Sequence, residues 1–121
     1  MKESILGAKS FAFALRIIKL YQFMLKEHRE FVLSKQILRS GTSIGANIEE
    51  SVHAQSKLDF LNKLSIGQKE ASETNYWLRL LKDSGYLEAR LAASLVGDCE
   101  EIQRLLAASI KTAKSNLNTG K

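Results

Sequence analysis

Residues 56–85 constrain the fold more than any other stretch of the chain. They read SKLDFLNKLSIGQKEASETNYWLRLLKDSG. Ser56 followed by Asp59 is typical of a helix N-terminus, and Ser84-Gly85 is typical of a helix end, so one long helix is predicted. Apolar and small residues recur along it at steps of four and three, which predicts near-parallel packing against other helices. This seam consists of Phe60, Leu64, Gly67, Ala71, Thr74, Leu78 and Leu81.

The middle of the seam is narrow, because Gly67, Ala71 and Thr74 carry small side chains. Large neighbours at ordinary spacing would leave a gap there, and gaps in a core lower stability. A second run of small residues, SGTSIGA at residues 40–46, is the best partner for this waist. We therefore expect residues 34–54 to form a helix, with Ser34 as its N-cap, that packs closely on the helix of residues 56–84. In the alternative interpretation SGTSIG is a loop, and Ser43 caps a shorter helix.

The N-terminal segment, residues 4–27, predicts a long helix that is apolar around most of its circumference. A bundle helix needs an apolar stripe only about 100° wide to meet its core. We therefore expect part of this helix to pack against another copy of the chain, which gives a homo-oligomer. An interfacial membrane helix fits the same pattern less well. Lys9, Arg16 and Lys19 disfavour a membrane span, and Lys9 also shortens the apolar run that a signal peptide needs.

The last segment, residues 88–115, carries an apolar stripe that predicts a fourth helix, with a bend or break at Gly97. Residues 116–121 are expected to be a frayed tail. The chain has 121 residues, no proline and no run of alternating apolar and polar residues, so strands are not expected. The predicted architecture is all-α: a single domain over residues 1–121, built as an up-down-up-down four-helix bundle.

Glu50 and His53 form a Glu-x-x-His pair, the kind that builds di-iron sites in helical bundles. Such a site needs a second pair, and the only other histidine is His28, near the end of the first helix. We interpret the pair as a solvated helix surface. No metal and no cofactor are expected.

Cys99 is the only cysteine, which suits a reducing cytoplasm and excludes an internal disulfide. Its neighbours Asp98 and Glu100 are expected to raise the pKa of the thiol, so we interpret it as a packed residue of the last helix and not as a nucleophile.

Glu70 and Glu73 share one side of their helix with Trp77. A structural role is expected for them, in which either carboxylate could pair with Arg39 while Trp77 covers the pair from water. The sequence contains no glycine-rich phosphate loop, no nucleophile triad and no nucleotide fingerprint. A non-enzymatic protein is therefore expected.

Basic residues are the remaining candidates for a functional surface. The net charge of +5 permits an anionic partner such as nucleic acid, although a solvated charged face is the alternative for a single chain. Symmetric assembly would repeat the charge and focus it on a polyanion. The residues expected to face phosphates are Lys9, Arg16, Lys19, Lys26, Lys111 and Lys114.

A family resemblance is carried by residues 34–81. The matching elements are Gln36, Arg39, Ser43-Ile44, Ala46-Asn47-Ile48-Glu49-Glu50, Ser56, Asp59-Phe60, Lys69-Glu70-Ala71, Glu73 and Tyr76-Trp77-Leu78. In these elements the chain resembles the bacterial four-helix-bundle family of 23S rRNA intervening-sequence proteins. The resemblance implies a ring of protomers, with a homopentamer as the expected form. The architecture is also similar to that of the accessory variability determinant of diversity-generating retroelements, a basic pentamer that works with a reverse transcriptase and RNA.

The resemblance implies no catalytic residues, and its elements map mostly onto the packing seam. A role in fold and assembly is therefore expected for Arg39, Gly41, Gly45, Asn47, Gly67, Glu70, Ala71, Glu73 and Trp77. The expected function is a cytoplasmic homo-oligomer that binds RNA or another nucleic acid. One alternative is a protein-interaction scaffold that recruits a different protein. A less favoured one is a metal-dependent enzyme built on Glu50, His53, Glu70 and Glu73.

Overall fold

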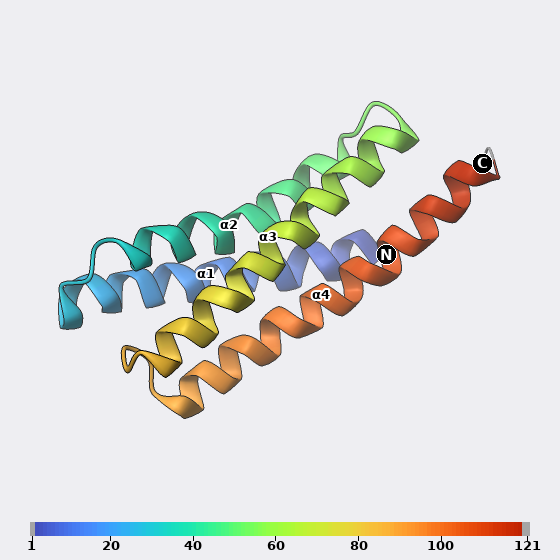
Figure 1. The fold of residues 1–121 in the computed structure, drawn as a ribbon. Coiled ribbons are helices and arrows are strands. Elements are labelled where there is room, and N and C mark those ends of the chain that lie inside the picture. Colours follow the sequence, from blue (N-terminus) through green and yellow to red (C-terminus); the bar gives the residue numbers. More distant parts are fainter. Residues whose placement is uncertain (1, 120–121) are drawn as a thin grey trace.

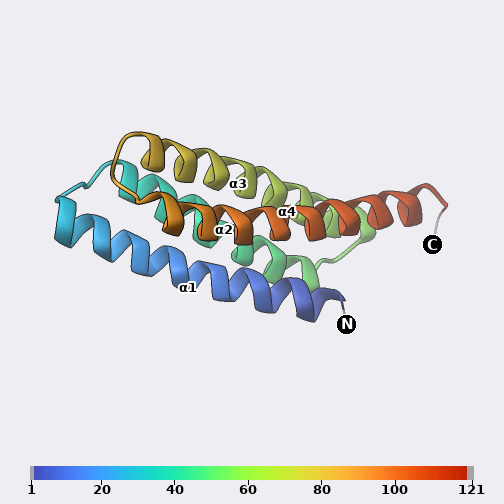
Figure 2. The same ribbon diagram turned by 90° about the horizontal axis from the view of Figure 1, so that it is seen from below.

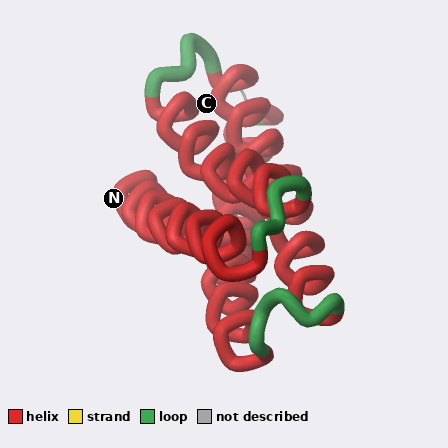
Figure 3. Tube along the Cα trace, turned by 90° about the vertical axis from the view of Figure 1, so that its left-hand side faces the viewer, coloured by secondary structure: helices red, strands yellow, loops and turns green. Residues whose placement is uncertain are grey.

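Four helices run up, down, up and down along one bundle. The computed structural model describes residues 2–119, with side chains from residue 5 onward. In chain order the helices are α1 (Lys2–His28), α2 (Leu33–Val52), α3 (Lys57–Asp83) and α4 (Ala89–Asn118) (Figure 1). Each helix packs broadly on the next one in the chain, whereas α1 and α4 meet along a much thinner contact. Figure 2 shows the same arrangement from below, and Figure 3 shows the short loops that join the helices. The all-α four-helix bundle predicted from the sequence is confirmed.

The core lies between the four helices and is built from aliphatic side chains. In residues 5–119 the largest fully buried apolar side chains are Phe13, Ile17, Met24, Ile37, Ile44, Leu64, Leu78, Leu81, Leu95, Ile102 and Leu106. Burial of such side chains is the main favourable term in the stability of a helix bundle. None of the helices in residues 2–119 is long and apolar enough to span a membrane.

The ends of α3 are where the sequence places them. Ser56 accepts a hydrogen bond from the backbone N–H of Asp59 at 3.0 Å, and the Asp59 carboxylate accepts one from the N–H of Gln55 at 3.3 Å. At the other end Ser84 follows the last helical residue, and Gly85 has φ +90°, a backbone conformation that glycine adopts at little cost.

The start of α2 corrects the prediction that Ser34 is its N-cap. Ser34 is buried, and its hydroxyl donates to the Glu30 carbonyl at 2.7 Å. The cap is instead the carboxylate of Glu30, which accepts hydrogen bonds from the backbone N–H groups of Val32, Leu33 and Ser34 at 3.1, 2.9 and 2.8 Å. Partial burial alone would raise the pKa of Glu30, but these backbone donors lower it below its ordinary value.

The two waists of small residues do meet. Thr74 donates its hydroxyl to that of Ser40 at 2.9 Å, and a Cβ placed on Gly67 would lie 3.7 Å from the carbonyl oxygen of Ile44. The run SGTSIG is continuous helix, so the alternative loop interpretation is wrong.

One detail of the waist needs correction, because the glycines of α2 face α1 and not α3. A Cβ on Gly41 would lie 2.8 Å from Ile17, and one on Gly45 would lie 3.4 Å from the hydroxyl of Ser10. Successive positions of a helix point in directions about 100° apart. One run of small residues can therefore serve two neighbours, with Ser40 and Ile44 turned to α3 and both glycines turned to α1.

The course of α4 also differs from expectation. Gly97 is exposed, and nothing lies within 4 Å of a Cβ placed on it, yet the helix runs through it without a break. One glycine costs a helix about 1 kcal/mol. The buried side chains of Ala92 and Leu95, before Gly97 in the chain, and of Cys99, after it, stabilise the helix by more than this cost. The helix also continues to Asn118, so the expected tail is helical up to that residue, while residues 120–121 lie outside the described part.

Candidate interaction surfaces

A polar cluster joins the outer sides of α2 and α3. Arg39 of α2 pairs with Glu70 at 3.0 Å and also with Glu73, and the indole N–H of Trp77 donates to Glu73 at 2.9 Å. The hydrogen bond from Trp77 and the one from Arg39 hold the pKa of Glu73 below its ordinary value. The bonds to Glu73 and Glu70 raise the pKa of Arg39. The expected pairing is therefore present for both carboxylates, which fixes α2 against α3.

The other residues assigned to packing also lie at helix contacts. Gly41 and Gly45 admit α1, whereas Gly67 lies within reach of Ile44 and Asn47. Asn47 donates its side-chain amide to the Ser43 carbonyl at 2.9 Å, one turn earlier in α2. Ala71 is fully buried, and its carbonyl accepts a hydrogen bond from the Cys99 thiol at 3.3 Å, which ties α3 to α4.

Two of the six basic residues proposed to face phosphates already form ion pairs within the chain. Lys9 pairs with Glu101 at 3.2 Å, and Arg16 pairs with Asp98 at 2.7 Å. Both pairs bridge α1 and α4 along the thin contact. They neutralise two cations that sequence reasoning treated as available, and their partners could not be identified from the sequence because they lie far along the chain.

The other four basic residues are exposed and make no ion pair among the side chains of residues 5–119. They do not form one continuous surface. Lys19 lies in the C-terminal half of α1, and Lys26 lies near its C-terminal end. Lys111 and Lys114 lie on the last turns of α4, which extend beyond the rest of the bundle at the opposite end (Figures 1 and 2).

The residues considered for metal chemistry have simple surface partners. Glu50 pairs with Lys63 at 2.9 Å, which raises the pKa of that lysine, and His53 lies 3.9 Å from Glu49. In residues 5–119 no group of three or more histidine, cysteine and carboxylate side chains is arranged to hold a metal ion.

Cys99 is fully buried. Burial, with Glu100 and Asp98 nearby, raises the pKa of its thiol to about 12. At neutral pH the thiol is therefore protonated and a poor nucleophile.

An apolar stripe lies on the outer side of α1. We call Phe11, Leu15 and Ile18 the α1 stripe; their exposed fractions are 68%, 50% and 38%. Spacings of four and three residues place them on one face of the helix. The sequence predicted excess apolar surface on this helix, but only the structure separates these three residues from the buried Phe13 and Ile17.

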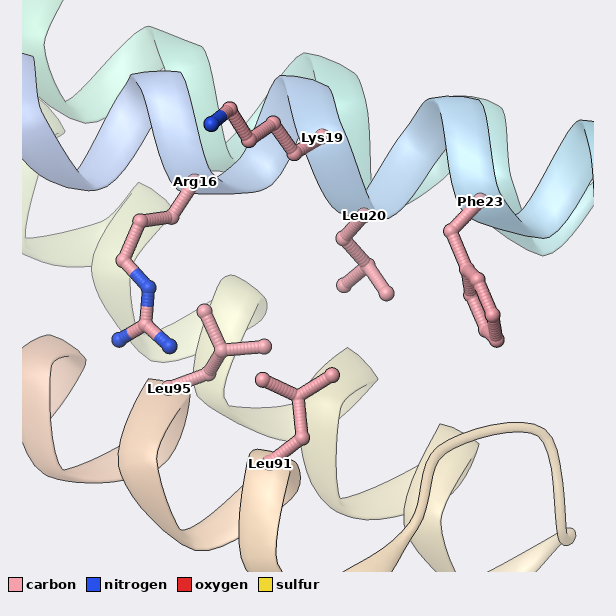
Figure 4. A pocket seen from close by; sticks show the side chains of 6 residues that line it. All are labelled: Arg16, Lys19, Leu20, Phe23, Leu91 and Leu95. Carbon is pink, nitrogen blue, oxygen red and sulfur yellow. The ribbon is translucent and has the colours of Figure 1, made fainter.

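An open pocket of about 310 Å³ lies between α1 and α4. In Figure 4, Leu20 and Phe23 point toward it from α1, Leu91 and Leu95 point toward it from α4, and Arg16 reaches across from α1. Lys19 lies along the rim. The pocket follows from the thin contact between the two helices, which local sequence patterns do not reveal.

Comparisons with known proteins agree with this architecture. Residues 2–108 match the family model described as 23S rRNA-intervening sequence protein. Among solved structures, a protein with unknown function from the S23 ribosomal protein family of Bacteroides thetaiotaomicron is 53% identical to this chain, with a TM-score of 0.90. The match covers 92% of this chain and 99% of that one. A comparison with curated proteins gives no match. The family match extends over most of the sequence, and the chain therefore belongs to the 23S rRNA-intervening sequence protein family.

Proposed function

We propose that this protein is a non-enzymatic, cytoplasmic assembly of identical chains that binds RNA through exposed lysines. A pentameric ring is the form that the family resemblance favours. The family description supports a connection with RNA in general terms, and the net charge of +5 per chain suits a polyanionic partner.

The observation that carries the proposal is the α1 stripe. Phe11, Leu15 and Ile18 present large apolar side chains to water on one helix face, although the same helix already contributes Phe13 and Ile17 to the core. Contiguous apolar patches on soluble proteins commonly mark sites of association. Covering this stripe with another copy would remove the unfavourable exposure without any change of fold.

Assembly is tested by the mass of the native particle. Wild type should sediment at micromolar concentration as a multiple of the 13.5 kDa chain. Leu15→Glu, which places a charge in the stripe, should give single subunits with unchanged helix content. Leu117→Glu is the control, because it changes an exposed leucine at the far end of α4. A wild-type protein that sediments as one subunit contradicts the proposal.

RNA binding is proposed to rest on Lys111 and Lys114. Both are exposed on the extending end of α4, and neither has an ion-pair partner among the described side chains. A gel-shift titration with structured RNA should show binding at about 50 mM salt that weakens steeply as salt rises. Replacing both lysines by glutamine should lower the affinity. It should also reduce the slope of log affinity against log salt by about 0.7–0.9 for each phosphate that the variant no longer neutralises.

The matched control for the RNA experiment is Lys35→Gln with Lys82→Gln. These exposed lysines lie in the first turn of α2 and the last turn of α3, so the same charge is removed from another part of the surface. Equal weakening in both double variants would mean that net charge, and not this end of α4, governs binding. Absence of any binding at low salt would contradict the RNA proposal.

A second candidate function is a scaffold that recruits a different protein. The pocket between α1 and α4 favours it, because Phe23 and Leu91 leave apolar surface there. Affinity capture from lysate with and without nuclease separates the two proposals. A scaffold retains its protein partner after nuclease treatment, whereas a partner bridged by RNA is released.

A further inference from the structure

The C-terminal half of α4 carries charge of a single sign. Residues 102–119 contain three cations, Arg104, Lys111 and Lys114, and no carboxylate. All three side chains are exposed, and among the side chains of residues 5–119 none of them has an ion-pair partner. We call these three residues the α4 basic face. It adds Arg104 to the two lysines already proposed to bind RNA.

The three cations point to one side of the helix, away from the core. A helix turns about 100° and rises about 1.5 Å per residue, so Arg104 and Lys111 differ by about 20° in direction and about 10 Å along the axis. Lys114 lies within about 80° of Arg104 and about 15 Å from it along the axis. The opposite side of the same segment holds the buried side chains of Leu106 and Ala113.

The neighbouring helices do not neutralise the α4 basic face. Helix α4 packs on α3 and α1, and residues 5–26 of α1 contain no carboxylate. The first half of α3 lies beside this part of α4, where Gln68 donates its side-chain amide to the Gln103 carbonyl at 3.1 Å. Residues 57–69 of α3 contain one carboxylate, Asp59, and three lysines. The electrostatic potential over this surface is therefore positive.

No structural role within α4 accounts for these cations. The carboxylates of Asp98 and Glu101 are paired with cations of α1, and Glu100, one turn before Arg104, forms no ion pair with it. Basic side chains stabilise the negative end of a helix dipole, but only within the last turn. The last turn of α4 contains no basic residue. The three cations thus remain available to a ligand.

Small side chains separate the three cations. Ala107 and Ala108 are exposed between Arg104 and Lys111, and the exposed residues Thr112 and Ser115 add hydroxyl groups next to the lysines. A ligand can therefore approach the helix backbone closely along this face. Access is greatest at residues 114–119, which are all exposed where α4 extends beyond the rest of the bundle (Figures 1 and 2).

The residue types on this face discriminate between forms of nucleic acid. Proteins hold single strands by stacking the bases on aromatic side chains, and α4 contains no aromatic residue. A double helix of RNA is held through its phosphates and through the 2′-hydroxyls in its wide, shallow minor groove. The α4 basic face supplies cations for the phosphates, and Thr112 and Ser115 supply hydroxyls that can bond to 2′-hydroxyls.

We propose that the α4 basic face binds double-helical RNA, with Arg104 as a third phosphate-binding residue beside Lys111 and Lys114. This inference rests on the proposed RNA binding. It specifies the form of the RNA and extends the site by about 10 Å toward the middle of α4. Because phosphates and 2′-hydroxyls are common to all sequences, binding is independent of the RNA sequence.

Three probes test the form of the nucleic acid. They are an RNA duplex of about 20 base pairs, which exceeds the span of a typical duplex-binding domain, one of its strands chosen to have no structure of its own, and a DNA duplex of the same sequence. Fluorescence anisotropy at about 100 mM salt should show the RNA duplex bound about fourfold more tightly than the strand, because three neutralised phosphates release more counterions from a duplex. The DNA duplex, which lacks 2′-hydroxyls, should also bind more weakly than the RNA duplex.

Arg104→Gln tests the extension of the site. It should weaken binding of the RNA duplex about five- to eightfold at about 100 mM salt and reduce the slope of log affinity against log salt by about 0.7–0.9, since one phosphate is no longer neutralised. The matched control is Arg90→Gln. Arg90 is an exposed arginine in the first turn of the same helix, so the variant removes the same charge far from the face. Its affinity should change less than about twofold. Circular dichroism should show the same helix content for both variants.

The outcomes separate failure of this inference from failure of the proposed RNA binding. Absence of binding to all three probes overturns both. Equal binding of the single strand or of the DNA duplex overturns the assignment to double-helical RNA alone. Equal weakening by Arg104→Gln and Arg90→Gln removes Arg104 from the site and leaves the role of the two lysines standing. A weakened Arg104→Gln variant with an unchanged salt slope also contradicts the inference, because Arg104 would then not neutralise a phosphate.

Discussion

At the scale of single residues, the bonds around Glu73 have a consequence for stability at acid pH. The pKa of Glu73 is lowered from its ordinary value of 4.5, first by the hydrogen bond from Trp77 and then by that from Arg39. A carboxylate with a depressed pKa stabilises the fold above its ordinary pKa, and this contribution is lost as the pH falls through the lower folded value. Protonation of Glu73 therefore contributes to acid unfolding.

The first prediction concerns Trp77→Phe. Without the indole N–H, the pKa of Glu73 should move up toward 4.5, and the free energy of unfolding at neutral pH should fall. The missing hydrogen bond is worth about 0.5–1.5 kcal/mol. Carbon-detected NMR titration of the carboxyl group measures the first effect, and urea unfolding measures the second. Tyr76→Phe is the control, because the Tyr76 hydroxyl is not a partner of Glu73; an unchanged Glu73 titration in Trp77→Phe would refute the assignment.

This cluster is predictable from the sequence because three of its four members are close together along one helix. Glu70, Glu73 and Trp77 are spaced by three and four residues, and Arg39 lies on the neighbouring helix of a hairpin. The partners of Lys9 and Arg16 are not predictable in this way. Arg16 and Asp98 are separated by 82 positions, and no local periodicity relates residues so far apart.

At the scale of helices, Gly41 and Gly97 have opposite surroundings, so replacing each by alanine should have opposite effects on stability. The space beside Gly41 is filled by fully buried Ile17, whose β-branched side chain has little freedom to move. The space beside Gly97 is open to solvent. Intrinsic helix propensity favours alanine at both positions, so any difference between the two substitutions in the free energy of unfolding measures packing.

The second prediction is that Gly41→Ala destabilises the protein while Gly97→Ala stabilises it. Overpacking should cost Gly41→Ala about 1–3 kcal/mol, partly offset by the gain in helix propensity. Gly97→Ala should gain about 0.5–1 kcal/mol. Urea unfolding at matched protein concentration measures both, and a stabilised Gly41→Ala variant would show that α1 can withdraw from α2 at little cost.

The N-terminal caps of α3 and α2 differ in how well the sequence predicts them. Ser56 and Asp59 of α3 act through their own neighbours, so their pattern predicts the helix start correctly. Ser34 has the residue type of a cap, but it lies inside α2, because Glu30 is long enough to reach three backbone N–H groups from outside the helix. Whether Ser34 or Glu30 caps α2 depends on the path of the loop between α1 and α2, which the residue types alone do not specify.

At the scale of the whole molecule, the reactivity of Cys99 reports on the separation of α3 and α4, because its thiol is enclosed where these two helices pack together. Burial, aided by Glu100 and Asp98, raises its pKa from 9.0 to about 12. A thiol with a raised pKa favours the folded state below the ordinary value, and this contribution is lost as the pH rises above 9.0.

The third prediction is that Cys99 is inert in the native protein. A thiol reagent such as Ellman's reagent at pH 8 should label less than one group per chain over the time in which the urea-unfolded chain is labelled completely. Cys99→Ala should give no signal in either state. Rapid labelling of the folded protein would mean that α3 and α4 separate readily, contrary to the broad contact between them.

The thin contact between α1 and α4 has a consequence for the order in which the molecule folds. All other helix contacts join helices that follow one another in the chain, so each can form by closure of a short loop. Such local contacts allow rapid folding. The hairpin of α1 and α2 can therefore form during synthesis, before the C-terminal quarter has left the ribosome. Both contacts of α4, the broad one with α3 and the thin one with α1 through Arg16–Asp98 and Lys9–Glu101, must wait until α4 itself has been made, and of the two only the contact with α1 joins helices that are far apart in the chain.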